Sequence, residues 1–155
     1  MSSSPPRKQR IGNARSAARL AAVQALYQRD MSGISVAVVL FEFHNHRLGV
    51  EVEGDLIRDA DVDFFNDIVA GVDARFAEIE DLISRNFAKG WTMDRIDRPL
   101  RAILRAGSYE LLARPDVPTA TVINEYVDVA HAFYEATESK FANGLLDSVA
   151  RQVRT

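Results

Sequence analysis

The residues with the clearest capacity for chemistry are the basic side chains that crowd the start of the chain. Residues 1–29 hold six basic side chains and no acidic one, whereas the rest holds 13 basic and 22 acidic residues. The opening segment therefore carries +6 and the remainder −9, within a net charge of −3. This asymmetry predicts contact with a polyanion, because cations that neutralise phosphates release bound counterions. The six residues are Arg7, Lys8, Arg10, Arg15, Arg19 and Arg29.

These cations are expected to occupy two settings, an arm and a helix. Residues 1–12 are rich in serine, proline and basic residues, a composition typical of a disordered arm. Arg15 and Arg19 follow at a spacing of four, which places both on one face of a helix. Phosphate contacts do not select a sequence, so base contacts need other side chains. The candidates for these contacts are Tyr27, Lys140, Phe141 and Asn143.

Residues that could support catalysis or metal binding form weaker patterns. The chain has no cysteine, which excludes disulfides and thiolate metal sites. His44 and His46 are two residues apart and would point to different faces of a helix, so a shared metal ion is not expected. Acidic clusters within residues 55–67 and 73–81 fit the solvated face of an amphipathic helix. No phosphate-binding loop or hydrolase motif is present. We therefore expect a protein without a catalytic centre, cofactor or metal.

The elements that must position the basic residues have helical patterns. Alanines at helical spacing predict a first helix from about Asn13 to Arg29 with a small-residue core face. The apolar segment Ile34–His46 is expected to be a second helix, because no other strand is available to pair with it. Residues 47–58 are expected to form a loop. The periodic apolar residues of Asp61–Phe87 predict one helix, in which Gly71 marks a bend or close packing.

Prolines and polar residues divide the second half of the chain. Pro99 predicts the start of a helix that runs to about Ala113, and the Pro-Asp-Val-Pro segment at 115–118 breaks the chain. A further helix is expected over 120–134, and Thr137 or Ser139 would cap a last one ending near Val153. The sequence thus predicts an all-α bundle of six or seven helices, with residues 13–155 as one domain. The basic start has no apolar signal segment and no run is long enough to cross a membrane, so a cytoplasmic protein is expected.

Four stretches, which occur in the family's order along the chain, resemble the NusB family of bacterial transcription antitermination factors. They are A-R-L-A-A-V-Q-A-L-Y at 18–27, L-R-A-I-L-R-A-G-S-Y-E-L-L at 100–112, D-V-P-T-A-T-V-I-N-E at 116–125 and S-K-F-A-N-G-L-L-D at 139–147. The resemblance covers residues from about 15 to 150. It implies two packed three-helix subdomains and no catalytic activity. It also implies binding to single-stranded boxA RNA in nascent ribosomal-RNA leader transcripts. The implied partners are the ribosomal protein NusE and the RNA-polymerase complex that contains NusA and NusG.

Site residues can be carried over where the family's motifs match. Arg15 and Arg19 match the arginine cluster that meets RNA at the start of the first helix in the family. Lys140 and Phe141, in the K-F-x-N-G motif with Asn143, match a second region near the RNA. The resemblance places four residues on the side of the protein partner, namely Tyr27, Asp94, Leu100 and Arg101.

Three other interpretations are compatible with the sequence. The chain could be the NusB-like domain of a ribosomal-RNA cytosine methyltransferase, although it contains neither a Gly-rich cofactor loop nor a catalytic cysteine. It could also be a protein–protein adaptor whose basic arm is incidental. Some members of the family self-associate, and a homodimer could cover the RNA face.

Overall fold

The computed structural model describes residues 7–46 and 61–154, and for residues 7–13 and 46 it describes the backbone alone. Seven α-helices and one short 3₁₀ helix make up this part of the chain, which contains no strand. The helices are α1 (Arg7–Ser32), α2 (Val36–His46), α4 (Val62–Ala74), α5 (Phe76–Arg85), η1 (Met93–Arg95), α6 (Arg98–Ala113), α7 (Thr119–Phe133) and α8 (Ala136–Val153). The expected all-α class is confirmed. The loop expected at residues 47–58 lies outside the described residues.

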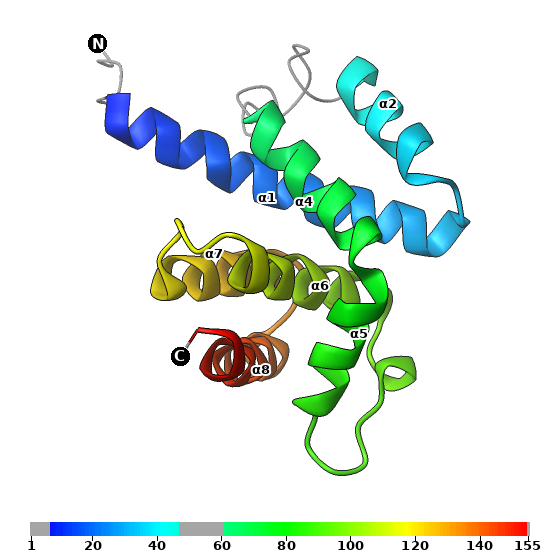
Figure 1. The fold of residues 1–155 in the computed structure, drawn as a ribbon, viewed down its shortest axis with the longest axis vertical. Coiled ribbons are helices and arrows are strands. Elements are labelled where there is room, and N and C mark those ends of the chain that lie inside the picture. The colour runs from blue at the N-terminus through cyan, green and yellow to red at the C-terminus, as the bar shows by residue number, and fades with distance from the viewer. Residues whose placement is uncertain (1–6, 47–60, 155) are drawn as a thin grey trace.

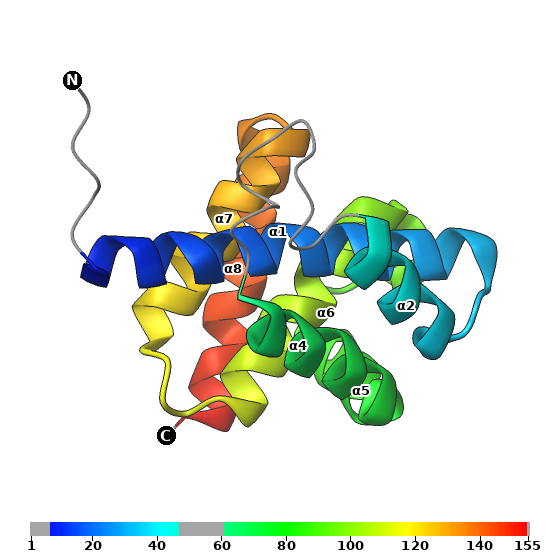
Figure 2. The same ribbon diagram turned by 90° about the horizontal axis from the view of Figure 1, so that it is seen from above.

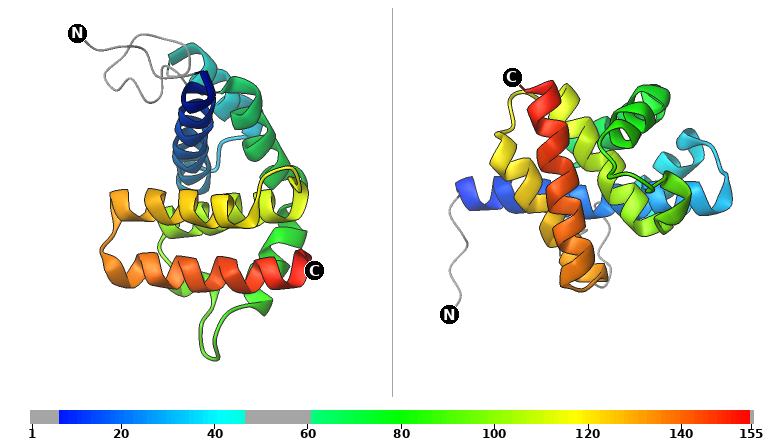
Figure 3. Two further views of the ribbon diagram at one scale, coloured as in Figure 1. Left: turned by 90° about the vertical axis from the view of Figure 1, so that its left-hand side faces the viewer. Right: turned by 90° about the horizontal axis from the view of Figure 1, so that it is seen from below.

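The helices form two groups of three that pack against each other (Figure 1). Helices α1, α2 and α4 contact one another, and so do α6, α7 and α8. Helix α1 joins the groups because it crosses α6 and α7, as Figure 2 shows from above. Helix α5 leans on α6 and α8, and α7 and α8 run side by side in Figure 3. The expected pair of three-helix subdomains is thus confirmed, with α5 added between them.

The alanine face of α1 is the centre of this junction. Ala18, Ala21, Ala22 and Ala25 are fully buried, and such small side chains let α4 and α6 approach the α1 backbone closely. The expected core face is confirmed, but the expected helix start near Asn13 is wrong, since α1 begins at Arg7. Residues 7–12, which were expected to belong to the arm, therefore have helical backbone. The physical reason is that no proline follows Pro6 in this segment, so each backbone N–H is available for the helix.

The long helix expected over Asp61–Phe87 is divided into two. The Asp61 carboxylate accepts a hydrogen bond from the Phe64 N–H at 3.0 Å and caps α4. Arg75, with φ −113° and ψ 29°, then separates α4 from α5. The apolar spacing continues through this single residue, so periodicity alone does not reveal the break. The break lets α4 pack on α1 while α5 turns towards α8.

Gly71 in α4 marks close packing, one of its two expected roles. A Cβ at this position would collide with the ring of Tyr109 on α6. The Tyr109 hydroxyl donates to the Asp67 Oδ1 at 2.7 Å, one turn before Gly71 on α4. The absence of a side chain at position 71 therefore sets the distance between α4 and α6.

The start of α6 agrees with the sequence prediction, whereas the start of α8 and the contacts of Arg154 at the end of α6 do not follow from it. Pro99 lies in the first turn of α6, as expected. Helix α8 begins after Glu135, so the expected caps at Thr137 and Ser139 are wrong; Ser139 instead donates to the Glu135 carbonyl one turn before it. The guanidinium of Arg154 donates to four carbonyl oxygens in the last turn of α6 and the loop after it. These acceptors belong to Glu110, Leu111, Arg114 and Val117.

Candidate nucleic-acid interface

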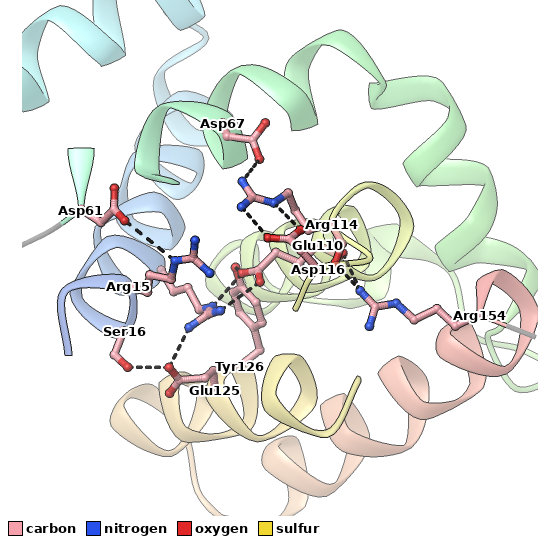
Figure 4. A network of polar contacts seen from close by, with 11 residues as sticks. Arg15, Ser16, Asp61, Asp67, Glu110, Arg114, Asp116, Glu125, Tyr126 and Arg154 are labelled. Carbon is pink, nitrogen blue, oxygen red and sulfur yellow. Dashed lines mark hydrogen bonds and ion pairs between the residues drawn. The ribbon is translucent and has the colours of Figure 1, made fainter. Parts of the chain in front are cut away.

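Arg19, expected on the RNA-facing side of the first helix, lies inside the protein. Its side chain is 3% exposed and makes two hydrogen bonds to Glu110, from Nε to Oε1 at 2.7 Å and from Nη2 to Oε2 at 3.1 Å. Its Nη1 donates to the Glu125 Oε1 at 2.7 Å. Glu110 on α6 and Glu125 on α7, both labelled in Figure 4, thus accept hydrogen bonds from the Arg19 guanidinium. The expectation of an exposed Arg19 is corrected, because two partner carboxylates draw it into the interface between helices.

The surroundings of Arg19 keep it charged despite its burial. Burial by itself would lower the pKa of Arg19, but the hydrogen bond and charge of Glu110 outweigh this effect, so its pKa is raised. The Tyr126 hydroxyl donates to Glu110 Oε1 at 2.6 Å, and the Ser16 hydroxyl donates to Glu125. Arg19 is therefore the centre of an internal polar network that joins α1, α6 and α7.

Arg15, one turn before Arg19 on α1, is partly exposed. Its side chain is 35% exposed, its Nε lies 3.8 Å from the Asp61 Oδ2, and its guanidinium lies 4.6 Å from the centroid of the Phe64 ring. The Asp61 N–H donates to the Ala14 carbonyl at 2.9 Å, which ties the start of α4 to α1. Arg15 is thus held beside α4 and can still present part of its guanidinium to solvent.

Carboxylates outnumber the described arginines around this end of α1. The guanidinium carbons of Arg19 and Arg114 each lie 4.9 Å from the Phe64 ring centroid, beside Arg15. Three arginines are therefore gathered here, and they face five carboxylates, those of Asp61, Asp67, Glu110, Asp116 and Glu125. A strongly positive surface would have to come from the side chains of Arg7, Lys8 and Arg10, which lie outside the described residues.

The second expected RNA region, on α8, differs in character from the first. Lys140 and Asn143 are exposed, and Lys140 has no ion pair within the described residues. Phe141 is half-buried: its ring stacks on Phe87, with centroids 6.3 Å apart, and touches Trp91, with centroids 5.5 Å apart. Phe141 is therefore covered on two sides by aromatic rings and is not a free stacking surface.

The residues expected on the partner side are spread between core and surface. Leu100 is 6% exposed, which corrects the expectation of a surface contact, since it faces the core from the first turn of α6. Tyr27 packs partly against the core, and Asp94 in η1 is exposed. The Arg101 Nε donates to the Ile96 carbonyl at 2.7 Å, so much of its guanidinium serves the fold.

A pocket of about 280 Å³ connects the second RNA region with the partner side. It lies between the segment that leads into α6 and the start of α8. Trp91, between α5 and η1, is one of its lining residues and was not predicted as a site residue. Its exposure on an aromatic cluster is a tertiary property without a local sequence signal. The lining residues are Trp91, Arg95, Ile96, Asp97, Leu100, Thr137, Glu138 and Phe141.

The described residues offer neither a metal site nor a helix able to span a membrane. Within 7–46 and 61–154, no three histidine, aspartate or glutamate side chains are placed to share a metal ion. Over the same residues, no helix combines the length and apolarity needed to cross a bilayer. The His44 Nε2 lies 2.7 Å from the Asn66 Oδ1 and its ring meets Phe65 edge-on, so His44 contributes to the contact between α2 and α4.

Comparison with known proteins adds independent information. The model of the NusB family matches residues 16–151. The transcription antitermination protein NusB of Novosphingobium aromaticivorans is 61% identical over 92% of this chain and 97% of its own length. The protein of the same name from Sphingopyxis alaskensis is 58% identical over 90% of this chain and 94% of its own length.

Solved structures share the fold at lower identity. NusB from T. maritima superimposes with a TM-score of 0.76 and 26% identity, over 91% of this chain and 93% of that one. A complex of the antitermination factors NusB and NusE with double-stranded RNA matches with a TM-score of 0.74 and 21% identity, over 90% of this chain and 97% of that one. At 21% identity, this second match bears on the fold alone.

Proposed function

Because this chain belongs to the NusB family, we propose that it is an RNA-binding transcription antitermination factor that acts by binding and not by catalysis. The observation that carries the proposal is the 61% identity, across nearly the whole of both chains, to a protein named for antitermination. Relatives matched over 94–97% of their own length carry that name, which favours this function over the methyltransferase alternative.

The finer function that we propose follows from the family resemblance. The protein would bind single-stranded boxA RNA of nascent ribosomal-RNA leader transcripts together with NusE. The pair would join the RNA-polymerase complex with NusA and NusG in the cytoplasm and support processive transcription. We take RNA and NusE as the partners from the family resemblance; the solved complex of NusB and NusE with double-stranded RNA shares the fold of this chain.

We assign the RNA contacts to a smaller set than the sequence suggested. Arg15 and Lys140 are the described cations of the matching motifs with exposed charge, and Asn143 is exposed beside Lys140. Phe141 would act by supporting its aromatic neighbours. We exclude Arg19 from the RNA contacts because its guanidinium already donates hydrogen bonds to Glu110 and Glu125. We keep Arg7, Lys8 and Arg10, the basic residues near the start of the chain, as RNA contacts because they are positively charged.

Titration of labelled boxA RNA at several salt concentrations, with and without NusE, tests the proposal. We expect tighter binding with NusE and an affinity that falls as salt rises. Arg15→Ala and Lys140→Ala should each weaken binding and lower the salt slope by about 0.7–1, the value of one phosphate contact. The matched control is Arg151→Ala, an exposed arginine of α8 paired with Asp147. No detectable binding at low salt with NusE present refutes the RNA function.

Self-association is the other assembly that the resemblance implies. The mass of the protein in solution, measured alone and with NusE, distinguishes a monomer that takes NusE from a homodimer. We propose the complex with NusE as the active form. A homodimer that persists with NusE present and binds no RNA would favour the adaptor interpretation.

A further inference from the structure

Trp91 is the outermost ring of a three-ring aromatic cluster. It is the only tryptophan of the chain and is 46% exposed, between α5 and η1. Its ring rests on Phe141 at 5.5 Å with an angle of 43° between the planes, and Phe141 in turn stacks on Phe87. Phe141 therefore backs one side of the indole, and the exposed part of the ring presents an apolar surface to solvent.

Three cations lie in the segments that carry this aromatic cluster: Lys89 shortly before Trp91, Arg95 on the lining of the same pocket, and Lys140 next to Phe141. Lys89, Arg95 and Lys140 are exposed, and none has an ion pair within the described residues. At the start of α1, by contrast, each described arginine lies within 4 Å of a carboxylate.

Acidic side chains are also present around the indole, and their positions matter. Asp97 accepts the hydrogen bond of the Tyr134 hydroxyl, and Glu138 is partly buried. Asp94 is exposed. The Glu138 Oε2 has no hydrogen-bond partner in the described residues, and Glu138 lines the same pocket as Trp91. Three cations without an ion pair therefore lie near two carboxylates, Asp94 and Glu138, that have no hydrogen-bond partner in the described part of the chain.

We propose that Trp91 is the platform on which an unpaired base of single-stranded RNA stacks, with Lys89, Arg95 and Lys140 contacting the flanking phosphates. An exposed aromatic ring bordered by free cations is the arrangement with which proteins bind single strands, since every base has a face that can stack and every nucleotide has a phosphate. The pocket beside the indole, about 280 Å³ in volume, leaves space for the edge of the stacked base. This assignment rests on the proposed RNA function and adds a residue to it.

The emission of Trp91 reports directly on its own role, because no other tryptophan contributes. Single-stranded boxA RNA is titrated into the protein while tryptophan emission is recorded, and the anisotropy of labelled RNA gives binding independently. We expect quenching that saturates together with the anisotropy change. Trp91→Ala should weaken binding about 5- to 150-fold, the range for loss of one stacked base. Trp91→Phe, which keeps a stacking ring, should recover most of the affinity.

Controls separate stacking from general effects on the fold. Phe41→Ala removes an aromatic ring that is 67% exposed on α2, a helix that packs on α1 and α4, and it should leave RNA binding unchanged. Thermal melting of each variant shows that it is folded.

Three results would overturn the proposal. Wild-type protein that binds RNA with unchanged emission, while Trp91→Ala binds equally well, refutes the platform and leaves the RNA function intact. Emission that changes with NusE alone and not with RNA makes Trp91 a protein contact instead. Absence of RNA binding by the wild type, at low salt with NusE, removes both proposals together.

Discussion

Replacement of Arg19 by alanine is expected to destabilise the protein even when no RNA is present. The substitution removes three hydrogen bonds and leaves Glu110, which is 0% exposed, with the Tyr126 hydroxyl as its remaining donor in the described residues. Removal of one partner of a buried ion pair costs about 3–5 kcal/mol, because the other charge stays buried without compensation. For a domain of this size that loss corresponds to a melting temperature lower by about 6–20 °C.

Urea unfolding followed by circular dichroism measures this loss. The matched control is Arg15→Ala on the same helix, whose side chain is 35% exposed and 3.8 Å from Asp61. An exposed pair of this kind contributes about 0–1 kcal/mol, so the two variants should differ clearly. The double variant Arg19→Met with Glu110→Gln should recover part of the loss, since no uncompensated charge remains at Glu110.

The results that would refute this reasoning are specific. If Arg19→Ala unfolds within about 1 kcal/mol of the wild type, the buried network does not stabilise the fold as its geometry indicates. If that variant keeps its stability and loses RNA binding, Arg19 is an RNA contact after all. A double variant less stable than Arg19→Ala would show that the loss does not come from the uncompensated charge of Glu110.

Four further predictions concern α6 and the helices that contact it. Gly71→Ala should lower the free energy of unfolding by about 1–3 kcal/mol, because the new Cβ meets the Tyr109 ring. Gly144→Ala should raise it by about 0.5–1 kcal/mol, because no atom lies within 4 Å of the new Cβ and alanine favours the helix. Thermal melts of the two variants that equal the wild-type melt would contradict both predictions. Burial, followed by the hydrogen bond to Asp67, raises the pKa of Tyr109 from its ordinary 10.0 to about 12. In the unfolded chain the tyrosine ionises at lower pH, so the free energy of unfolding should fall as the pH rises from about 10 to about 12. The fall should be less steep in Tyr109→Phe. Urea midpoints of the wild type and Tyr109→Phe that change in parallel with pH would exclude this role of Tyr109. Arg154→Ala should lower the unfolding free energy by at least about 1–3 kcal/mol, because carbonyl acceptors at the end of α6 lose their donor, and an unchanged urea midpoint would count against it.

Much of the helical architecture could be predicted from local sequence patterns. Apolar residues at helical spacing predicted α4 and α6, and the alanines of α1 predicted the face on which the two groups of helices meet. The motifs at 100–112, 116–125 and 139–147 were sufficient to identify the family, which the comparisons then showed. These features depend on residues close together in the chain, where spacing translates directly into a shared helix face.

Local spacing was less informative where a helix ends or changes direction. The break at Arg75 leaves the apolar period intact, so spacing alone does not show where α4 ends. The start of α1 at Arg7 was predicted wrongly because the composition of residues 7–12 is also typical of a disordered arm, although no proline after Pro6 interrupts the helix.

Only the tertiary structure decided which charged and aromatic residues are available to a ligand. Arg15 and Arg19 share one helix face in the sequence, yet Arg19 is buried by Glu110 and Glu125, which lie 91 and 106 residues further along the chain. The opposite change occurs at position 91, where a tryptophan in an unremarkable linker becomes the exposed end of an aromatic cluster with Phe141. The reason is common to both cases: helical spacing specifies a face, whereas burial depends on which distant helix covers that face and on the charge it brings.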